Sequence, residues 1–149
     1  MPASFSLKTL LDLSRNRSDA AAKKLGYLNL QEQAANQKLL LLMDYRHDYE
    51  IRFRDCAKNG IGQTEWRNFI AFMNKLDAAI AAQHKTVAHS RYNREAGGDE
   101  FISQQRKLKS YDTLAQRYQR AAIRLENKRE QREQDEHAAN STVYNQFAL

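Results

Sequence analysis

The residue types that most often perform catalysis or hold metal ions are few in this chain and widely spaced. The four histidines are His47, His84, His89 and His137. His84 and His89 are five residues apart, whereas two metal ligands on one helix face need a spacing of three or four. No glycine-rich phosphate loop, HExxH or CxxC pattern occurs in the sequence. The sequence therefore predicts a protein that is not an enzyme and that binds neither a metal ion nor another cofactor.

The single cysteine, Cys56, cannot form an internal disulfide, so nothing indicates an oxidising compartment. The longest apolar run, Leu39–Met43, is far shorter than the ~20 residues that cross a bilayer. The first residues have neither the basic nor the apolar region of a secretory signal. We expect a cytoplasmic protein in which Cys56 is a buried structural thiol.

Two apolar stripes have the spacing that suits docking to another protein. Their residues are Leu42, Tyr45 and Tyr49 on one predicted helix, and Phe72, Leu76 and Ala79 on another. A two-helix hairpin buries only one seam, so Tyr45, Phe72 and Ala79, which fall beside it, widen the apolar faces beyond what the partner helix covers. Exposed aromatic stripes indicate a docking surface. The alternative is that Tyr45 and Phe72 fold back over the seam.

Positive charge is concentrated between Phe101 and Arg132. Nine Lys or Arg residues and three acids give this stretch a balance of +6, which equals the net charge of the whole chain. Six basic side chains in this stretch are candidates for binding: Arg106, Lys107, Lys109, Arg117, Arg120 and Arg124. They could contact nucleic-acid phosphates, enter an acidic protein cavity, or form a solvated face. Glu126 and Glu130 interrupt the positive run, and we expect no nucleic-acid partner.

Few and long elements must position these residues, because the chain contains only five glycines and one proline. The strongest break follows Lys58, where Asn59 and Gly60 tolerate the left-handed conformation that ends a helix, and Thr64 can cap the next helix. The sequence predicts a first helix over about 5–58, a turn over 59–63, a second helix over about 64–138 and a frayed tail over 139–149. We expect all of these to form a single coiled-coil domain, 1–149.

Heptad patterns on both sides of the turn predict how the two helices pair. The apolar-rich series with seven-residue spacing run from Leu7 to Cys56 and from Leu11 to Phe53 upstream, and from Trp66 to Ala122 and from Phe69 to Leu125 downstream. A 3.5-residue period kept this long is typical of a left-handed coiled coil, and a short connection makes the helices antiparallel neighbours. The predicted fold class is therefore all-α, a long antiparallel two-helix coiled coil, or helical hairpin.

The second predicted helix is longer than the first. The pairing leaves it without a partner from about Tyr118 onward. The heptad register holds across Gly97–Gly98, but each glycine in a helix costs about 1 kcal/mol relative to alanine. We expect a bend or local loosening at this pair, with helix on both sides; the alternative is a true break into two helices.

Several segments resemble the FliJ family of flagellar proteins. The similar segments are Leu41–Tyr49, the turn Asn59-Gly60-Ile61, Trp66, the stripe from Phe72 to Ile80, and a later segment from Arg106 to Leu114. The similarity spans nearly the whole chain. The resemblance rests mainly on the combination of Asp-Tyr-x-x-x-Tyr with Asn-Gly-Ile and Trp.

This resemblance implies a component of the flagellar type III export apparatus. Proteins of the family form an antiparallel coiled coil similar to the stalk subunit of rotary ATPases. They associate with the export ATPase FliI and its regulator FliH, contact the export-gate protein FlhA, and help to recycle export chaperones. The resemblance thus implies a stalk-like activator and escort protein, cytoplasmic and peripheral at the inner membrane through its partners.

The resemblance also implies two binding surfaces. The surface for the export gate is Leu42, Tyr45, Tyr49, Phe72, Leu76 and Ala79. The chain departs from the family at two further positions of this surface: Lys38 replaces a glutamine, and Gln83 replaces a histidine unless an inserted residue brings His84 there. The six basic residues from Arg106 to Arg124 would lie inside or beside the ATPase ring.

Two other functions stay open on the sequence. The first is the equivalent stalk protein of a virulence type III secretion system, which shares this physical chemistry and differs only in genetic context. The second, less favoured, is a basic helical hairpin that binds nucleic acid, which would show steeply salt-dependent affinity for DNA or RNA.

Overall fold

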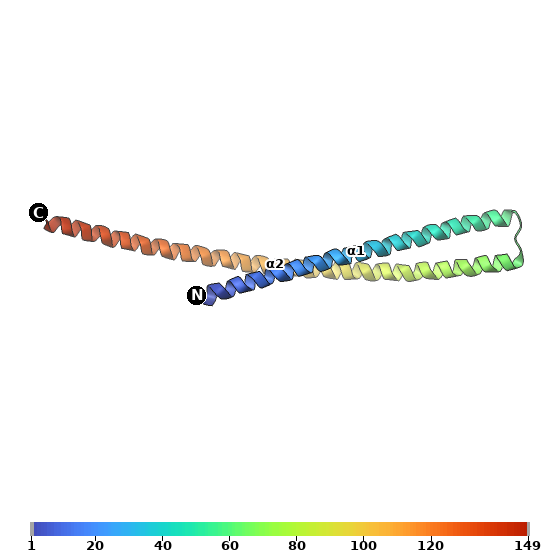
Figure 1. Cartoon of the computed structure of the whole chain (residues 1–149), viewed down its shortest axis with the longest axis horizontal. Coiled ribbons are helices and arrows are strands. Elements are labelled where there is room, and N and C mark those ends of the chain that lie inside the picture. Colours follow the sequence, from blue (N-terminus) through green and yellow to red (C-terminus); the bar gives the residue numbers. More distant parts are fainter. Residues whose placement is uncertain (1, 149) are drawn as a thin grey trace. The chain divides into compact units, whose positions relative to one another are not determined.

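The computed structural model describes residues 2–148, with side chains from residue 6 onward. It contains two helices, α1 (Pro2–Lys58) and α2 (Gln63–Phe147), and no strand among these residues (Figure 1). The two helices run in opposite directions and pack against each other. The predicted all-α helical hairpin is confirmed. Among the described residues, neither helix contains a stretch that is long and apolar enough to span a bilayer.

The turn ends α1 through a glycine in the left-handed region. Gly60 has a φ of +87°, and its N–H donates to the Ala57 carbonyl at 3.3 Å. On the other side, the Trp66 N–H donates to the Gly62 carbonyl at 3.0 Å, so α2 begins at Gln63. Thr64 therefore lies inside the first turn of α2 rather than before it, where the sequence placed it as a cap.

Contacts within the chain group its residues into two compact units. One unit comprises residues 19–103 and includes the turn; the other combines the residues up to 18 with those from 104 onward. The single domain 1–149 that the sequence suggests stays a prediction.

In the unit that contains the turn, the buried residues follow the predicted heptads. They are Ala21, Leu28 and Ala35 of α1 and Leu76, Gln83, Val87 and Gly97 of α2. Each of them occupies a predicted seam position, so the heptad register is confirmed on both helices. The register also holds across the glycine pair, because Gly97 is itself in the seam.

In the other unit, Leu7, Ser14 and Ser18 are the buried residues of α1. The Gln105 amide donates to the Ser18 hydroxyl at 3.3 Å. Burial on α2 ends at Ala115, and every described residue from 116 to 148 is exposed. The prediction that the second helix outruns the first is thus confirmed.

The helix α2 continues without interruption through Gly97 and Gly98, so the alternative of a break between two helices is wrong. Gly97 is buried, and a Cβ added to it would lie 2.5 Å from the Leu28 Cδ1 atom. A Cβ on Gly98 would meet nothing within 4 Å. The close approach of the two helices therefore explains the first glycine of the pair and not the second.

The helix α2 also extends to Phe147, beyond the end at about residue 138 that the sequence indicated. No glycine or proline interrupts residues 139–147. The Thr142 hydroxyl is used within the helix, since it donates to the Ala138 carbonyl at 2.9 Å. Residues 139–147 are therefore helical despite their polar composition, and the frayed tail that the sequence predicted there is not observed.

Candidate functional site

Aromatic rings from both helices form a layer beside the turn. Phe53 contacts Trp66 and Phe69, with ring centroids 5.0 and 4.9 Å apart. Tyr49 contacts Phe69 and Phe72, at 4.9 and 4.5 Å. Tilted and edge-on rings at these distances attract one another beyond their area burial. This layer therefore holds α1 and α2 together next to the turn.

The thiol of Cys56 lies outside this layer. Cys56 is exposed, so the expectation of a buried structural thiol is wrong. The reason is that the last ring contact between the helices, Phe53 with Trp66, lies almost one helical turn earlier on α1. Beyond it the chain enters the turn, and no residue of α2 covers position 56.

One flank of the seam is apolar at its centre. Tyr45 contacts Phe72 edge-on, with centroids 6.1 Å apart, yet Tyr45 keeps 51% of its surface exposed. Lys38 precedes Tyr45 by seven residues and Ala79 follows Phe72 by seven, and both are exposed. Since seven residues return to the same side of a coiled-coil helix, these four side chains share one flank. We call Lys38, Tyr45, Phe72 and Ala79 the aromatic flank.

Three other residues of the predicted gate surface belong to the seam. Leu42 and Tyr49 are half-buried, and Leu76 is buried, with 7% of its surface exposed. Leu76 therefore presents almost nothing to a partner. The structure brings together Tyr45, Tyr49 and Phe72 through ring contacts to Phe72, whereas Leu76 belongs to the core.

The two alternative positions for the family histidine differ in the structure. Gln83 is buried in the seam, and its side-chain amide donates to the Ala35 carbonyl at 2.9 Å. His84 is exposed, but it follows Asp77 by seven residues and so lies on the opposite flank. Neither side chain extends the aromatic flank.

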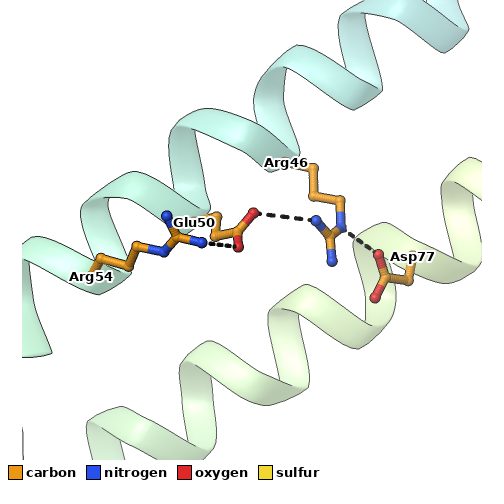
Figure 2. Close-up of polar contacts among 4 residues, drawn as sticks. All are labelled: Arg46, Glu50, Arg54 and Asp77. Atoms are coloured by element: carbon orange, nitrogen blue, oxygen red, sulfur yellow. Dashed lines mark hydrogen bonds and ion pairs between the residues drawn. The ribbon is translucent and has the colours of Figure 1, made fainter.

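The opposite flank is a network of charges (Figure 2). The Arg46 Nε donates to the Asp77 Oδ1 at 2.5 Å, across the two helices, and the Arg46 Nη1 lies 3.5 Å from the Glu50 Oε2. The Arg54 Nη2 donates to the Glu50 Oε1 at 3.0 Å. The hydrogen bond to Asp77, together with its negative charge, raises the pKa of Arg46 above its usual value. We call this side, which is continued by Arg91, the ion-paired flank.

One charged contact was not anticipated from the sequence. Glu32, a seam residue with 14% of its side chain exposed, pairs with Arg91 at 3.5 Å and with Arg94. Opposite charges at seam positions of the two helices are the signal that could have identified it. The pairing satisfies a carboxylate that would otherwise be costly in a largely buried position.

The six basic candidates are all exposed on α2. Arg106, Lys109 and Arg117 line a shallow, open depression together with Leu114. Within the part of the chain that the structure describes, none of the six has a carboxylate at ion-pair distance. Their charges therefore face solvent and can meet a partner.

Comparison with known proteins decides the family. The family model of the flagellar FliJ protein matches residues 3–146, which include both helices and the turn. The chain belongs to the FliJ family. The flagellar FliJ protein of Salmonella typhi is 28% identical over 137 residues, which are 92% of this chain and 93% of the relative. The flagellar FliJ protein of Escherichia coli K12 is 26% identical over 137 residues, which are the same shares of the two chains.

A third relative matches a shorter part of the chain. The flagellar FliJ protein of Buchnera aphidicola subsp. Schizaphis graminum is 27% identical over 97 residues, 65% of this chain and 64% of the relative. The matches to the FliJ proteins of Salmonella and Escherichia cover nearly the full length of both chains. The similarity therefore extends over the hairpin and most of the longer helix.

Proposed function

We propose that this chain is a component of the flagellar type III export apparatus that couples the export ATPase to the export gate and escorts export chaperones. Membership of the FliJ family supports the flagellar apparatus. All three relatives described above are flagellar, which favours this setting over a virulence secretion system. The proposed location is the cytoplasm, with the membrane reached through partner proteins.

The aromatic flank carries the proposal for gate binding. Tyr45 is half-exposed beside Phe72, and Ala79 continues the apolar surface along α2. The ion-paired flank, by contrast, satisfies its charges within the chain. Large aromatic side chains that are held by neighbouring rings and remain partly exposed are typical anchors of protein interfaces. The gate protein FlhA is the proposed occupant.

The remaining residues of the predicted gate surface have different proposed roles. Leu42 and Tyr49 line the edge of the seam and contribute area next to Tyr45. Leu76 and Gln83 act indirectly, by holding the two helices in register. His84 lies outside the proposed surface.

The basic residues on α2 are the proposed contact with the ring of the ATPase FliI. Its regulator FliH is a further proposed partner, with no surface assigned to it. A stalk that moves within a ring must avoid deep and permanent contacts. Exposed ion pairs are each worth only about 0–1 kcal/mol and are screened by salt. Long basic side chains such as Arg106, Arg117 and Arg124 could therefore attract the ring through many weak contacts that add up.

Binding of the purified cytoplasmic domain of FlhA tests the proposal. Tyr45→Ala should lower the affinity about tenfold or more, because an interface anchor contributes more than about 1.4 kcal/mol. His84→Ala, on the ion-paired flank, is the matched control and should leave the affinity unchanged. Both variants should keep the helical circular-dichroism signal of the parent chain.

Two outcomes contradict the proposed gate surface. Unchanged binding by Tyr45→Ala shows that FlhA docks elsewhere. A loss of helicity in the same variant shows that Tyr45 is a structural residue that folds back over the seam, which is the alternative that the sequence left open.

A further inference from the structure

The outer face of α1 carries an apolar stripe that neither proposed surface uses. Tyr27, Leu30, Ala34 and Leu41 follow one another at intervals of three, four and seven residues, and Gln37 fills the remaining position of this heptad pattern. Tyr27, Leu30 and Leu41 expose 61, 65 and 70% of their surfaces. The helix α2 thus leaves the three large side chains largely uncovered, and we call these five residues the outer stripe.

The outer stripe is more than a scatter of single apolar residues. Three large side chains within 15 positions are more than 60% exposed, and Leu40, beside the stripe, is 61% exposed. Single exposed apolar residues are normal on a soluble protein, but a contiguous patch marks an interaction site. Asp44 ends the pattern on one side and Lys23 on the other. The stripe is therefore about two heptads long.

The surroundings of the outer stripe are positively charged. Lys23, Lys24 and Lys38 lie around it, and Glu32 is the only carboxylate between Asp19 and Asp44. Glu32 is turned into the seam, where two arginines pair with it. A shallow groove that runs beside the stripe also lacks acidic residues; its lining includes Ala34 and Lys38 of α1 and Thr86 and His89 of α2.

The spacing and the charge together define the occupant. An apolar seam at 3.5-residue intervals on a convex helix fits the seam of a second helix, and a polar residue such as Gln37 within it fixes register. Lysines along the stripe favour a partner with carboxylates at the flanking positions. We infer that the outer stripe binds an amphipathic helix of another protein whose apolar seam is flanked by Asp and Glu.

Two designed peptides provide the test. Both are helices of roughly three heptads with Leu at the seam positions; one has Glu and the other has Lys at the flanking positions. Fluorescence anisotropy with the full chain should show binding of the Glu-flanked peptide at least about tenfold tighter than of the Lys-flanked peptide, with a smaller difference at high salt. This experiment uses neither FlhA nor the ATPase, so its failure and that of the proposed function are separable.

Two variants and one control locate the binding. The double variant Leu30→Gln/Leu41→Gln should lower the affinity for the Glu-flanked peptide about tenfold or more, since it removes two anchors. Lys24→Glu/Lys38→Glu should reverse the preference between the two peptides. Tyr92→Gln, at a position of α2 in the same unit that is 70% exposed, is the matched control and should change neither affinity.

Three results would overturn the inference. They are the absence of binding by the Glu-flanked peptide, equal binding by the Leu30→Gln/Leu41→Gln variant, and a preference that the lysine variant does not reverse. Vesicles of phosphatidylglycerol and phosphatidylcholine address a membrane as the occupant. The stripe would be assigned to an anionic lipid surface if two results came together. The parent chain would sediment with these vesicles while the Leu30→Gln/Leu41→Gln variant did not, and the parent chain would bind both peptides equally.

Discussion

The segment beside the turn and the last part of α2 are both helical, but different interactions stabilise them. Beside the turn, rings of α1 and α2 contact one another directly, as in the pair Phe53 and Trp66. After Ala115, the side-chain contacts seen among the described residues lie within one helix, such as Arg129 with Glu133 at 3.6 Å. Local pairs of this kind contribute only about 0.2–0.5 kcal/mol each. Tertiary packing therefore fixes the first region, whereas the second depends on helix propensity and leaves its side chains exposed.

Substitutions in the two regions should differ most in their effect on the free energy of unfolding. Phe53→Ala should lower the free energy of unfolding by about 2–3 kcal/mol, somewhat less than a fully buried phenylalanine, because Phe53 is half-buried. Leu125→Ala, at a position 75% exposed on the last part of α2, should change it by less than about 0.5 kcal/mol. Urea denaturation followed by circular dichroism measures both. Equal losses in the two variants would refute the contrast between packed and unpacked helix.

The glycine pair contrasts a packed and an unpacked position in two adjacent residues. Gly98→Ala should stabilise the protein by up to about 1 kcal/mol, because alanine favours the helix and the new Cβ meets nothing within 4 Å. Gly97→Ala gains the same propensity but forces the Leu28 side chain to move, so we expect it to be less stable than Gly98→Ala. Thermal unfolding should rank the two variants. Equal stabilisation of both would show that the seam does not require a glycine at position 97.

The sequence predicts the hairpin well because its information is periodic. Seven-residue spacing determines which side of each helix is buried, and the positive φ of Gly60 follows from the residue type at the turn. What the sequence could not show depends on which side chains meet. The clash that a Cβ on Gly97 would make with Leu28, the pairing of Glu32 with Arg94, and the exposure of Cys56 all require both helices to be placed.

The candidate site was only partly predictable for the same reason. Spacing alone put Tyr45 and Phe72 beside the seam, where the structure also places them in contact. Spacing also put Leu76 in the seam, where the structure buries it, so its place on the gate surface rested on the resemblance alone. The ion pairs on the flank of His84 required both helices to be placed. One residue of offset moves a side chain from the seam to a flank, as Gln83 and His84 show.

The smallest expected effect concerns the ion-paired flank. Arg46→Gln should lower stability slightly, and by the same amount at about pH 6 and about pH 9. The pKa of Arg46 is higher in the folded chain than in the unfolded chain. The contribution of Arg46 to folding stability is therefore fully present below the unfolded-state pKa. It is lost only at strongly alkaline pH, where the arginine of the folded chain loses its proton.

The matched control for this arginine is Arg54→Gln. Arg54 pairs with Glu50 on its own helix, whereas Arg46 bridges to Asp77 on α2, so Arg54→Gln should have a smaller effect. Urea midpoints at the two pH values provide the measurement. A contribution of Arg46 that declines between pH 6 and pH 9 would contradict an ion pair in which the arginine stays charged over this range.

If the proposed surfaces for FlhA and FliI are separate, two variants should each lose one partner and keep the other, and binding of both variants to both partners measures this. Tyr45→Ala/Phe72→Ala should weaken binding to the FlhA cytoplasmic domain and leave association with FliI unchanged. Reversal of Arg117, Arg120 and Arg124 to glutamate should weaken FliI association at low salt, with a smaller difference at high salt, and should leave FlhA binding intact. If either variant weakens binding to both partners equally while remaining helical, FlhA and FliI do not use separate surfaces of the chain.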